Sequence, residues 1–107
     1  MYKAHELVAE KHMVTKLVLK LPGRTYTFNT ARDDDRSLAE MIKANANGNP
    51  KPGSVYWMLK NYPDESMWYK DIRYKHLPKD VAESYRAWEI RKDKIMGYEC
   101  LNSRENY

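Results

Sequence analysis

Residues 13–29 read MVTKLVLKLPGRTYTFN, and this stretch decides which fold the sequence predicts. Apolar and polar side chains alternate along residues 13–21 and again along 24–29, which is the period of a strand. Pro22-Gly23 separates the two runs and suits a turn, because proline fixes φ and glycine accepts a positive φ. We therefore predict a β-hairpin, joined by a loop of about three to five residues with a bulge.

A rival interpretation of the same region is one continuous helix over residues 4–21. Leu7, Val14 and Leu21 also fit one face of a helix. We favour the hairpin because the alternating positions of residues 13–29 carry β-branched and aromatic side chains.

Beyond residue 33 the apolar spacing changes from two residues to 3.6, which predicts helices. Asp33-Asp34-Asp35 suits the positive end of a helix dipole and is expected to cap the first helix rather than to bind a metal ion. Ser54 is expected to cap a second helix that ends at Asn61. The remaining expected segments are a third helix over residues 64–76, a long helix over 79–96 and a frayed tail over 100–107.

The chain of 107 residues matches one domain of ordinary size. The fold class that we expect is α+β, with the hairpin at about 13–29 packed on three to four helices within about 34–96. Each element should bury the side chains that follow its own period. The expected core is Leu17, Leu19, Phe28, Leu38, Ile42, Val55, Leu59, Trp68, Val81, Tyr85 and Trp88.

Composition limits the function classes. The charged fraction is 32% and the apolar fraction 42%, which is typical of a folded domain rather than a disordered chain. The net charge of +4 permits binding to a polyanion without requiring it. No apolar run approaches the roughly 20 residues that span a bilayer, and the first residues lack a signal core. We therefore expect no membrane contact and a cytoplasmic location.

Few residues suggest chemistry. Cys100 is the only cysteine, which excludes an internal disulfide, and no basic residue that would stabilise a thiolate is adjacent to it. His5 and His12 lie seven residues apart, whereas the zinc-protease motif separates its histidines by four. No glycine-rich phosphate loop is present. We expect a non-enzymatic protein with no cofactor and no metal site.

Residues 37–63 read SLAEMIKANANGNPKPGSVYWMLKNYP and place two helical segments around a Gly/Asn/Pro break. A helix-turn-helix element needs a small residue in its first helix and an apolar residue inside its second. Ala39 and Leu59 meet this requirement. The break at residues 43–53 is longer than the usual turn, so the pattern indicates a helix-turn-helix-like element with a long turn.

The following stretch, PGSVYWMLKNYPDESMWYKDIRYKH, resembles the helix-turn-helix region of small terminase subunits of tailed phages. The helix VAESYRAWEI at residues 81–90 is similar to the long helix of that family. The resemblance covers residues 37–90 and implies DNA binding and a phage or mobile-element origin, although the family has no counterpart of the hairpin. The matching positions are Pro52, Ser54, Val55, Met58-Leu59, Pro63, Asp64-Glu65, Tyr69 and Arg73.

Two functions are therefore expected. The first is a phage-type protein that binds duplex DNA through the helix over residues 54–61, in the cytoplasm of the host cell. The second is a phage-encoded inhibitor that binds a host factor or defence protein through exposed aromatic side chains. Homo-oligomer formation is left open. Trp57 either faces the partner or packs against Trp68 or Trp88 in the core. The expected contact residues are Ser54, Tyr56, Trp57, Lys60, Asn61, Lys70, Arg73, Lys75 and Arg86.

Overall fold

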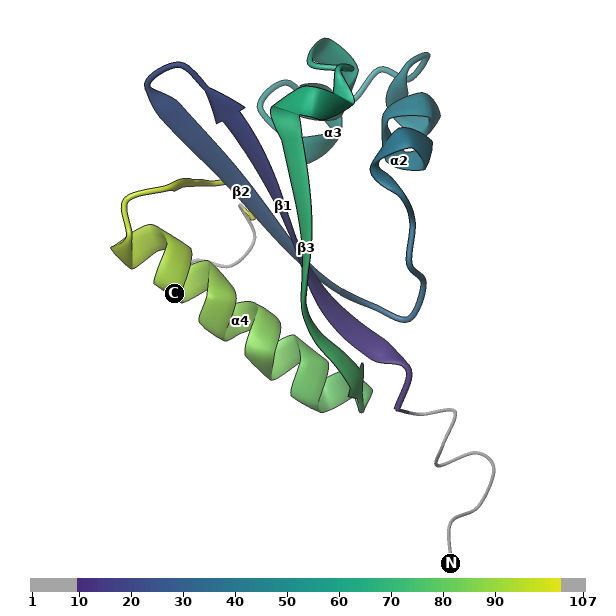
Figure 1. The fold of residues 1–107 in the computed structure, drawn as a ribbon, viewed down its shortest axis with the longest axis vertical. Coiled ribbons are helices and arrows are strands. Elements are labelled where there is room, and N and C mark those ends of the chain that lie inside the picture. The colour runs from purple at the N-terminus through teal and green to yellow at the C-terminus, as the bar shows by residue number, and fades with distance from the viewer. Residues whose placement is uncertain (1–9, 103–107) are drawn as a thin grey trace, which may run out of the picture.

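A computed structural model describes residues 10–102, which form a four-stranded sheet with helices on both faces (Figure 1). The strand order is β3-β1-β2-β4. The α+β class is therefore confirmed. The elements are β1 (His12–Leu21), β2 (Arg24–Arg32), α2 (Leu38–Asn45), α3 (Val55–Asn61), the 3-10 turn η1 (Glu65–Met67), β3 (Trp68–Leu77), α4 (Lys79–Ile95) and β4 (Glu99–Cys100).

β1 and β2 run antiparallel, with Leu21 opposite Arg24. Pro22-Gly23 is thus the whole loop, and the expected longer loop is wrong. Gly23 has a φ of +80°, which lets a two-residue connection close after the proline. The alternative of a helix over residues 4–21 is also wrong from His12 onward, while residues 4–9 lie outside the described residues.

The expected third helix is wrong, because the chain forms η1 and then β3 in its place. β3 pairs antiparallel with β1, so that Trp68 lies opposite Leu19. The apolar residues of β3 fit both a strand and a helix, and local periodicity therefore could not decide between them. Pairing with β1 decides it, because only a strand there satisfies the edge of β1 and buries Trp68, which is 7% exposed. β1 is consequently a central strand rather than half of an isolated hairpin.

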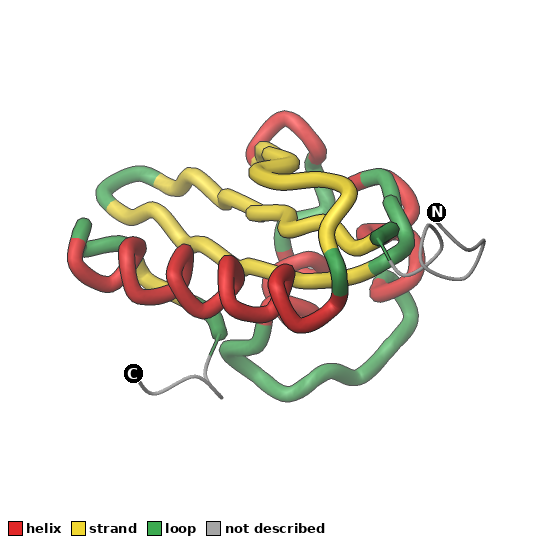
Figure 2. The backbone as a smooth tube through the Cα atoms, turned by 90° about the horizontal axis from the view of Figure 1, so that it is seen from below, coloured by secondary structure: helices red, strands yellow, loops and turns green. Residues whose placement is uncertain are grey.

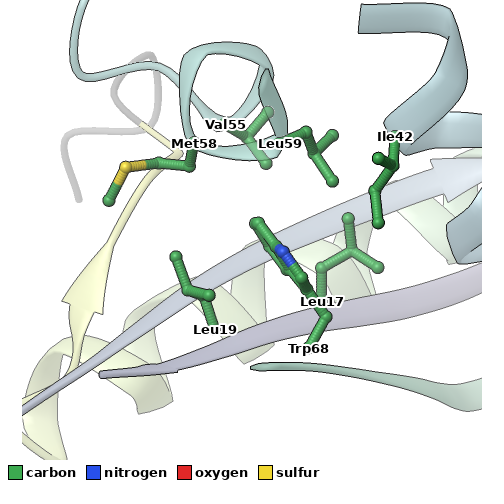
Figure 3. Packing of buried hydrophobic residues seen from close by; sticks show 7 residues of the cluster. All are labelled: Leu17, Leu19, Ile42, Val55, Met58, Leu59 and Trp68. Carbon is green, nitrogen blue, oxygen red and sulfur yellow. The ribbon is translucent and has the colours of Figure 1, made fainter. Parts of the chain in front are cut away.

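The main apolar core lies between the sheet and the α2–α3 pair (Figure 3). Odd-numbered residues of β1 point to this face, and the two helices cover them with one apolar side each. Phe28 and Leu38 pack against this cluster at half burial. The cluster consists of Leu17, Leu19, Ile42, Val55, Met58, Leu59 and Trp68.

A serine side chain caps the N-terminus of each of these two helices. Ser54 caps α3 as expected, because its Oγ accepts a hydrogen bond from the Trp57 amide at 3.2 Å. Ser37 caps α2 because its Oγ accepts a hydrogen bond from the Glu40 amide at 3.1 Å, and the Ser37 hydroxyl donates to the Glu40 carboxylate at 3.1 Å. The expected cap by Asp33-Asp34-Asp35 is wrong, since the serine with glutamate three residues later is the stronger signal.

α4 packs along the opposite face of the sheet, over β2 and β1 (Figure 2). It buries Ala82, Glu89, Ile90 and Asp93. The expected burial of Tyr85 and Trp88 is wrong, because both side chains are exposed, and Val81 is half buried. The sheet explains this rotation: Lys16 points toward α4 and needs a carboxylate partner, which a helix turned to bury Trp88 would not supply.

The end of the described chain is fixed to the sheet. β4 runs parallel to β2, and the Leu101 amide donates to the Thr27 carbonyl at 2.7 Å. Asn102 is buried, and its side-chain amide accepts a hydrogen bond from the Asn29 amide and donates one to the Asn29 carbonyl. The expected frayed tail is therefore wrong for residues 100–102, while residues 103–107 lie outside the described part of the chain.

Candidate functional site

The outer side of α4 presents large apolar side chains to solvent. Tyr85 is 39% exposed, Trp88 52% and Ile95 77%. Spacings of three and seven residues place these three side chains along one side of the helix. Met96 and Tyr98 are also exposed just beyond the end of the helix. We call Tyr85, Trp88 and Ile95 the α4 stripe.

β3 supports one edge of the stripe. The ring of Tyr74 stacks on Tyr85, with centroids 4.5 Å apart and an interplanar angle of 16°. The Tyr74 hydroxyl donates to the Glu89 carboxylate at 3.2 Å. Lys92 Nζ lies 3.2 Å and Arg73 Nε 3.6 Å from the same carboxylate. The stripe is therefore bordered by a fixed aromatic ring and two cations.

A buried ion network holds α4 in this orientation. Lys16 Nζ lies 3.0 Å from Glu89 Oε1 and also bonds Asp93, and Asn29 Nδ2 donates to Asp93 at 2.9 Å. Burial acts to lower the pKa of the Lys16 amine, but the two carboxylates outweigh it and raise that pKa above its ordinary value. Burial likewise acts to raise the pKa of Glu89, and Lys16 and Lys92 outweigh it and lower that pKa. Lys16 and Glu89 therefore both stay charged at neutral pH.

The predicted contact residues on α3 are mostly engaged within the protein. Ser54 caps the helix, and its hydroxyl also donates to the Lys51 carbonyl at 2.7 Å. Trp57 is half buried against the core cluster, which supports its structural interpretation. Lys60 and Asn61 are exposed, but Lys60 Nζ donates to the Gly48 carbonyl and Asn61 Nδ2 to the Trp57 carbonyl. The exposed Tyr56 is the large side chain that this helix offers a partner.

The predicted basic contacts divide between the two sides of the sheet. Lys70 pairs with Asp35 in the connection before α2, on the side of α3. Arg73 reaches Glu89 of α4 on the other side, and Arg86 is a residue of α4 itself. Lys75 is exposed on β3. The structure therefore does not bring these cations onto a single surface around α3.

Charge is also distributed unevenly. Residues 32–67, which include α2 and α3, contain five basic and six acidic residues, whereas residues 68–102 contain eight basic and six acidic residues. The positive excess therefore lies with β3 and α4 and with the β1–β2 pair, not with the two helices of the expected helix-turn-helix. α2 and α3 do pack together, but residues 46–54 connect them and β3 follows them.

Sequence reasoning missed the α4 stripe as a surface. The sequence predicts that Tyr85 and Trp88 lie in the core, whereas the structure exposes both. Lys16 is the signal that could have corrected this prediction, because a lysine among the apolar residues of a strand needs a carboxylate partner from the element that packs on it. A second face of the same helix carries Glu89 and Asp93 at i, i+4 spacing, which suits one buried cation.

The chain matches no family model, no curated protein and no solved structure. Within residues 10–102, no group of three or more metal-ligating side chains converges. None of the helices in that part of the chain is both long and apolar enough to cross a membrane.

Proposed function

We propose that this chain is a non-enzymatic protein-binding module that contacts its partner through the α4 stripe. The observation that carries the proposal is the large apolar side of α4 that faces solvent, while two carboxylates take places on its buried side beside Ala82 and Ile90. The helix buries Glu89 and Asp93 against the sheet and exposes Trp88 and Ile95 to solvent. A helix of a globular domain ordinarily buries its large apolar side chains and exposes its carboxylates, so the exposed apolar side is best explained by a partner that covers it.

The composition of the surface fits a protein contact. Tryptophan and tyrosine supply the largest share of binding energy at many interfaces, and they do so near the centre of the contact. Trp88 lies in the middle of the stripe, and the stacked Tyr74 holds Tyr85 in place. Such pre-ordering reduces the entropy that binding must remove.

The same surface defines the chemistry of the partner. An apolar pocket would receive Trp88, and acidic groups at its edge would face Arg73 and Lys92. The phage origin implied by the terminase resemblance would make this partner a host protein, and the binding would inhibit it.

Site-directed photo-crosslinking tests the proposal. A photoreactive residue at position 88 should crosslink one protein of the host, whereas the same residue at Tyr56, on α3, should not. The affinity for that purified partner should fall about 30-fold or more in Trp88→Ala, the loss expected of a hot spot of about 2 kcal/mol. Tyr56→Ala is the matched control. Equal affinity of the wild type and Trp88→Ala would end the proposal, and crosslinking to a second copy of the chain would identify the partner as itself.

Nucleic-acid binding is the second candidate, because part of the positive excess of the chain lies with β3 and α4, the elements that carry the stripe and the ring stacked on it. Arg73 and Arg86, both expected phosphate contacts, are on β3 and α4 near the stripe. Aromatic side chains beside cations can stack on bases while the cations contact phosphates. In this proposal α4 and β3, rather than α3, meet the nucleic acid.

A salt titration separates the two candidates. If nucleic acid is bound, log affinity should fall linearly with log salt, with a slope near −0.9 for each phosphate contact on duplex DNA. Lys75→Ala should flatten the slope by about one contact. If α3 reads the DNA, Lys60→Ala should flatten it instead. No binding to duplex or single-stranded DNA at low salt would exclude the nucleic-acid candidate and leave the protein-binding proposal in place.

A further inference from the structure

The outer edge of β3 is a long unpaired edge of the sheet. β3 and β4 are the two outer strands, but β4 has two residues whereas β3 has ten. Within residues 10–102, no backbone hydrogen bond joins β3 beyond Trp68 to a segment other than β1. Such an edge offers a row of backbone donors and acceptors to another strand.

The pairing of β2 shows where the backbone groups of β1 point. The Thr27 carbonyl accepts from the Leu101 amide, so the backbone groups of Thr27 face away from β1. Thr27 lies opposite Val18, and two residues that face each other in an antiparallel pair direct their backbone groups either both into the pair or both away from it. Val18 therefore turns its amide and carbonyl toward β3. Asn29, whose backbone groups bond a side chain beyond β4, gives the same direction for Lys16.

The same alternation identifies the outward groups of β3. Tyr69 and Asp71 lie opposite those two residues of β1, so their backbone groups bond β1. Lys70 and Ile72 alternate with them, and their amides and carbonyls consequently face outward. The Trp68 amide agrees with this pattern, because it donates to the first residue of η1 rather than to β1.

We propose that β3 pairs antiparallel with β3 of a second copy of this chain, with Ile72 facing its own copy. A two-fold axis has to place one residue opposite itself, because neighbouring pairs alternate between the hydrogen-bonded and the open type. The two Ile72 residues then exchange both of their outward backbone hydrogen bonds. The axis is perpendicular to the sheet, so the two sheets become continuous and both α4 stripes lie on the same face.

Charge selects Ile72 as the centre. With Ile72 on the axis, Asp71 of each copy lies opposite Arg73 of the other, where facing side chains come closest. Asp71 and Arg73 are also paired within each copy at 2.9 Å, so four charges of alternating sign come together. A centre at Lys70, Asp71 or Arg73 would set a charge against its own copy. A centre one residue beyond Arg73 would set Arg73 against Lys75, and like charges directly opposite each other are destabilising.

Hydrogen exchange followed by NMR tests the pairing. Arg73 is the extra residue of a bulge, since the register against β1 shifts after Ile72, and regular pairing is therefore short. We expect a dissociation constant of about 0.1–1 mM. The Lys70 and Ile72 amides should exchange fast in dilute protein and gain protection as sedimentation equilibrium reports the dimer, while the Asp71 amide stays protected throughout. A monomer at about 2 mM protein, or a dimer without new protection at Lys70 and Ile72, overturns the proposal.

Proline at the axis tests the hydrogen bonds. Ile72→Pro removes the outward amide and keeps the amides that bond β1, because a strand tolerates proline where its N–H faces outward. The loss occurs twice by symmetry, so the dissociation constant should rise about 30-fold. Ile72→Thr retains the amide and is the matched control. Equal dissociation constants for the two variants would contradict the pairing.

A cysteine at the axis tests the register without depending on the proline variant. In a Cys100→Ser background, Ile72→Cys should form an intermolecular disulfide on mild oxidation, because facing residues of this type have Cα atoms about 5.5 Å apart. Tyr69→Cys is the control and should not link, since Tyr69 would lie about 20 Å from its own copy. Linking at Tyr69→Cys but not at Ile72→Cys, or at neither position, overturns the register.

The dimer does not depend on the proposed function. Trp88→Ala, which should weaken binding of the host protein, should leave the dimer of β3 intact. Loss of the dimer in Trp88→Ala would mean that two copies meet through the α4 stripe instead, and would overturn the β3 contact. The failure of either proposal can therefore be recognised separately.

Discussion

Lys16 is the residue on which the α4 side of the sheet depends. It lies on a central strand, and its amine bonds two carboxylates that are themselves buried on one side of α4. Burying a charged group is unfavourable unless it finds its opposite charge, and here the close approach of the Lys16 amine to the two carboxylates supplies that compensation. The network consequently specifies which side of α4 meets the sheet.

Removal of the cation should therefore be costly. Lys16→Met keeps the length of the side chain but leaves Glu89 and Asp93 buried without their partner. We expect a loss of about 3–5 kcal/mol in the free energy of unfolding. Urea titration at neutral pH measures it. Lys20→Met, on the same strand but exposed, is the control and should change stability by less than about 0.5 kcal/mol. A similar, small loss in both variants would show that the network does not stabilise the fold.

Acid should weaken the same network with a defined sign. The pKa of Glu89 is lowered from its ordinary value of 4.5, because Lys16 and Lys92 outweigh the opposite effect of burial. For a carboxyl whose pKa is depressed on folding, the stabilisation is complete above the unfolded-state pKa and disappears as pH falls through the folded-state pKa. The free energy of unfolding of the wild type should therefore decline below about pH 4.5. Glu89→Gln should decline less steeply, and an identical slope in both proteins would refute this account.

At the scale of elements, α4 shows what periodicity can and cannot decide. The bounds of the helix and its apolar positions follow from the sequence, because proline and acidic residues mark its start and the spacing marks its faces. The side that is buried depends on the sheet, and in particular on Lys16. β3 is a similar case. Its residues fit both the helical and the strand period, and only the pairing with β1 decides that they form a strand. Sequence therefore predicted the class and several elements, but not the sheet order or the stripe.

The orientation of α4 has a direct consequence for stability. Trp88→Ala should cost about 1 kcal/mol or less, because the side chain is 52% exposed and leaves no enclosed cavity. Ile90→Ala should cost about 2–5 kcal/mol, because Ile90 is fully buried against the sheet. Thermal or urea unfolding of the two variants compares the two sides of the helix. The reverse order would mean that Trp88 faces the core.

For the whole molecule, the sheet separates two surfaces with different properties. One face carries the apolar core, α2 and α3, and the other carries the ion network and the α4 stripe. The basic residues that were expected to form one DNA contact are divided by this sheet. Their division is not visible in the sequence, because it arises where β3 joins β1 and brings Lys70 beside Asp35 and Arg73 beside Glu89.

The closure of the fold by its last described residues can be tested directly. Asn102 accepts a hydrogen bond from the Asn29 amide and donates one to the Asn29 carbonyl, each at 2.8 Å, in place of a strand partner. Asn102→Ala would leave both backbone groups buried without these bonds, at a cost of about 1–3 kcal/mol. The Leu101 amide, which bonds Thr27, should then exchange with solvent faster, while the amides of β1 keep their protection. Glu99→Ala, at an exposed position of β4, is the control. Unchanged exchange at Leu101 in Asn102→Ala would show that β4 is held by its own pairing with β2, and not by Asn102.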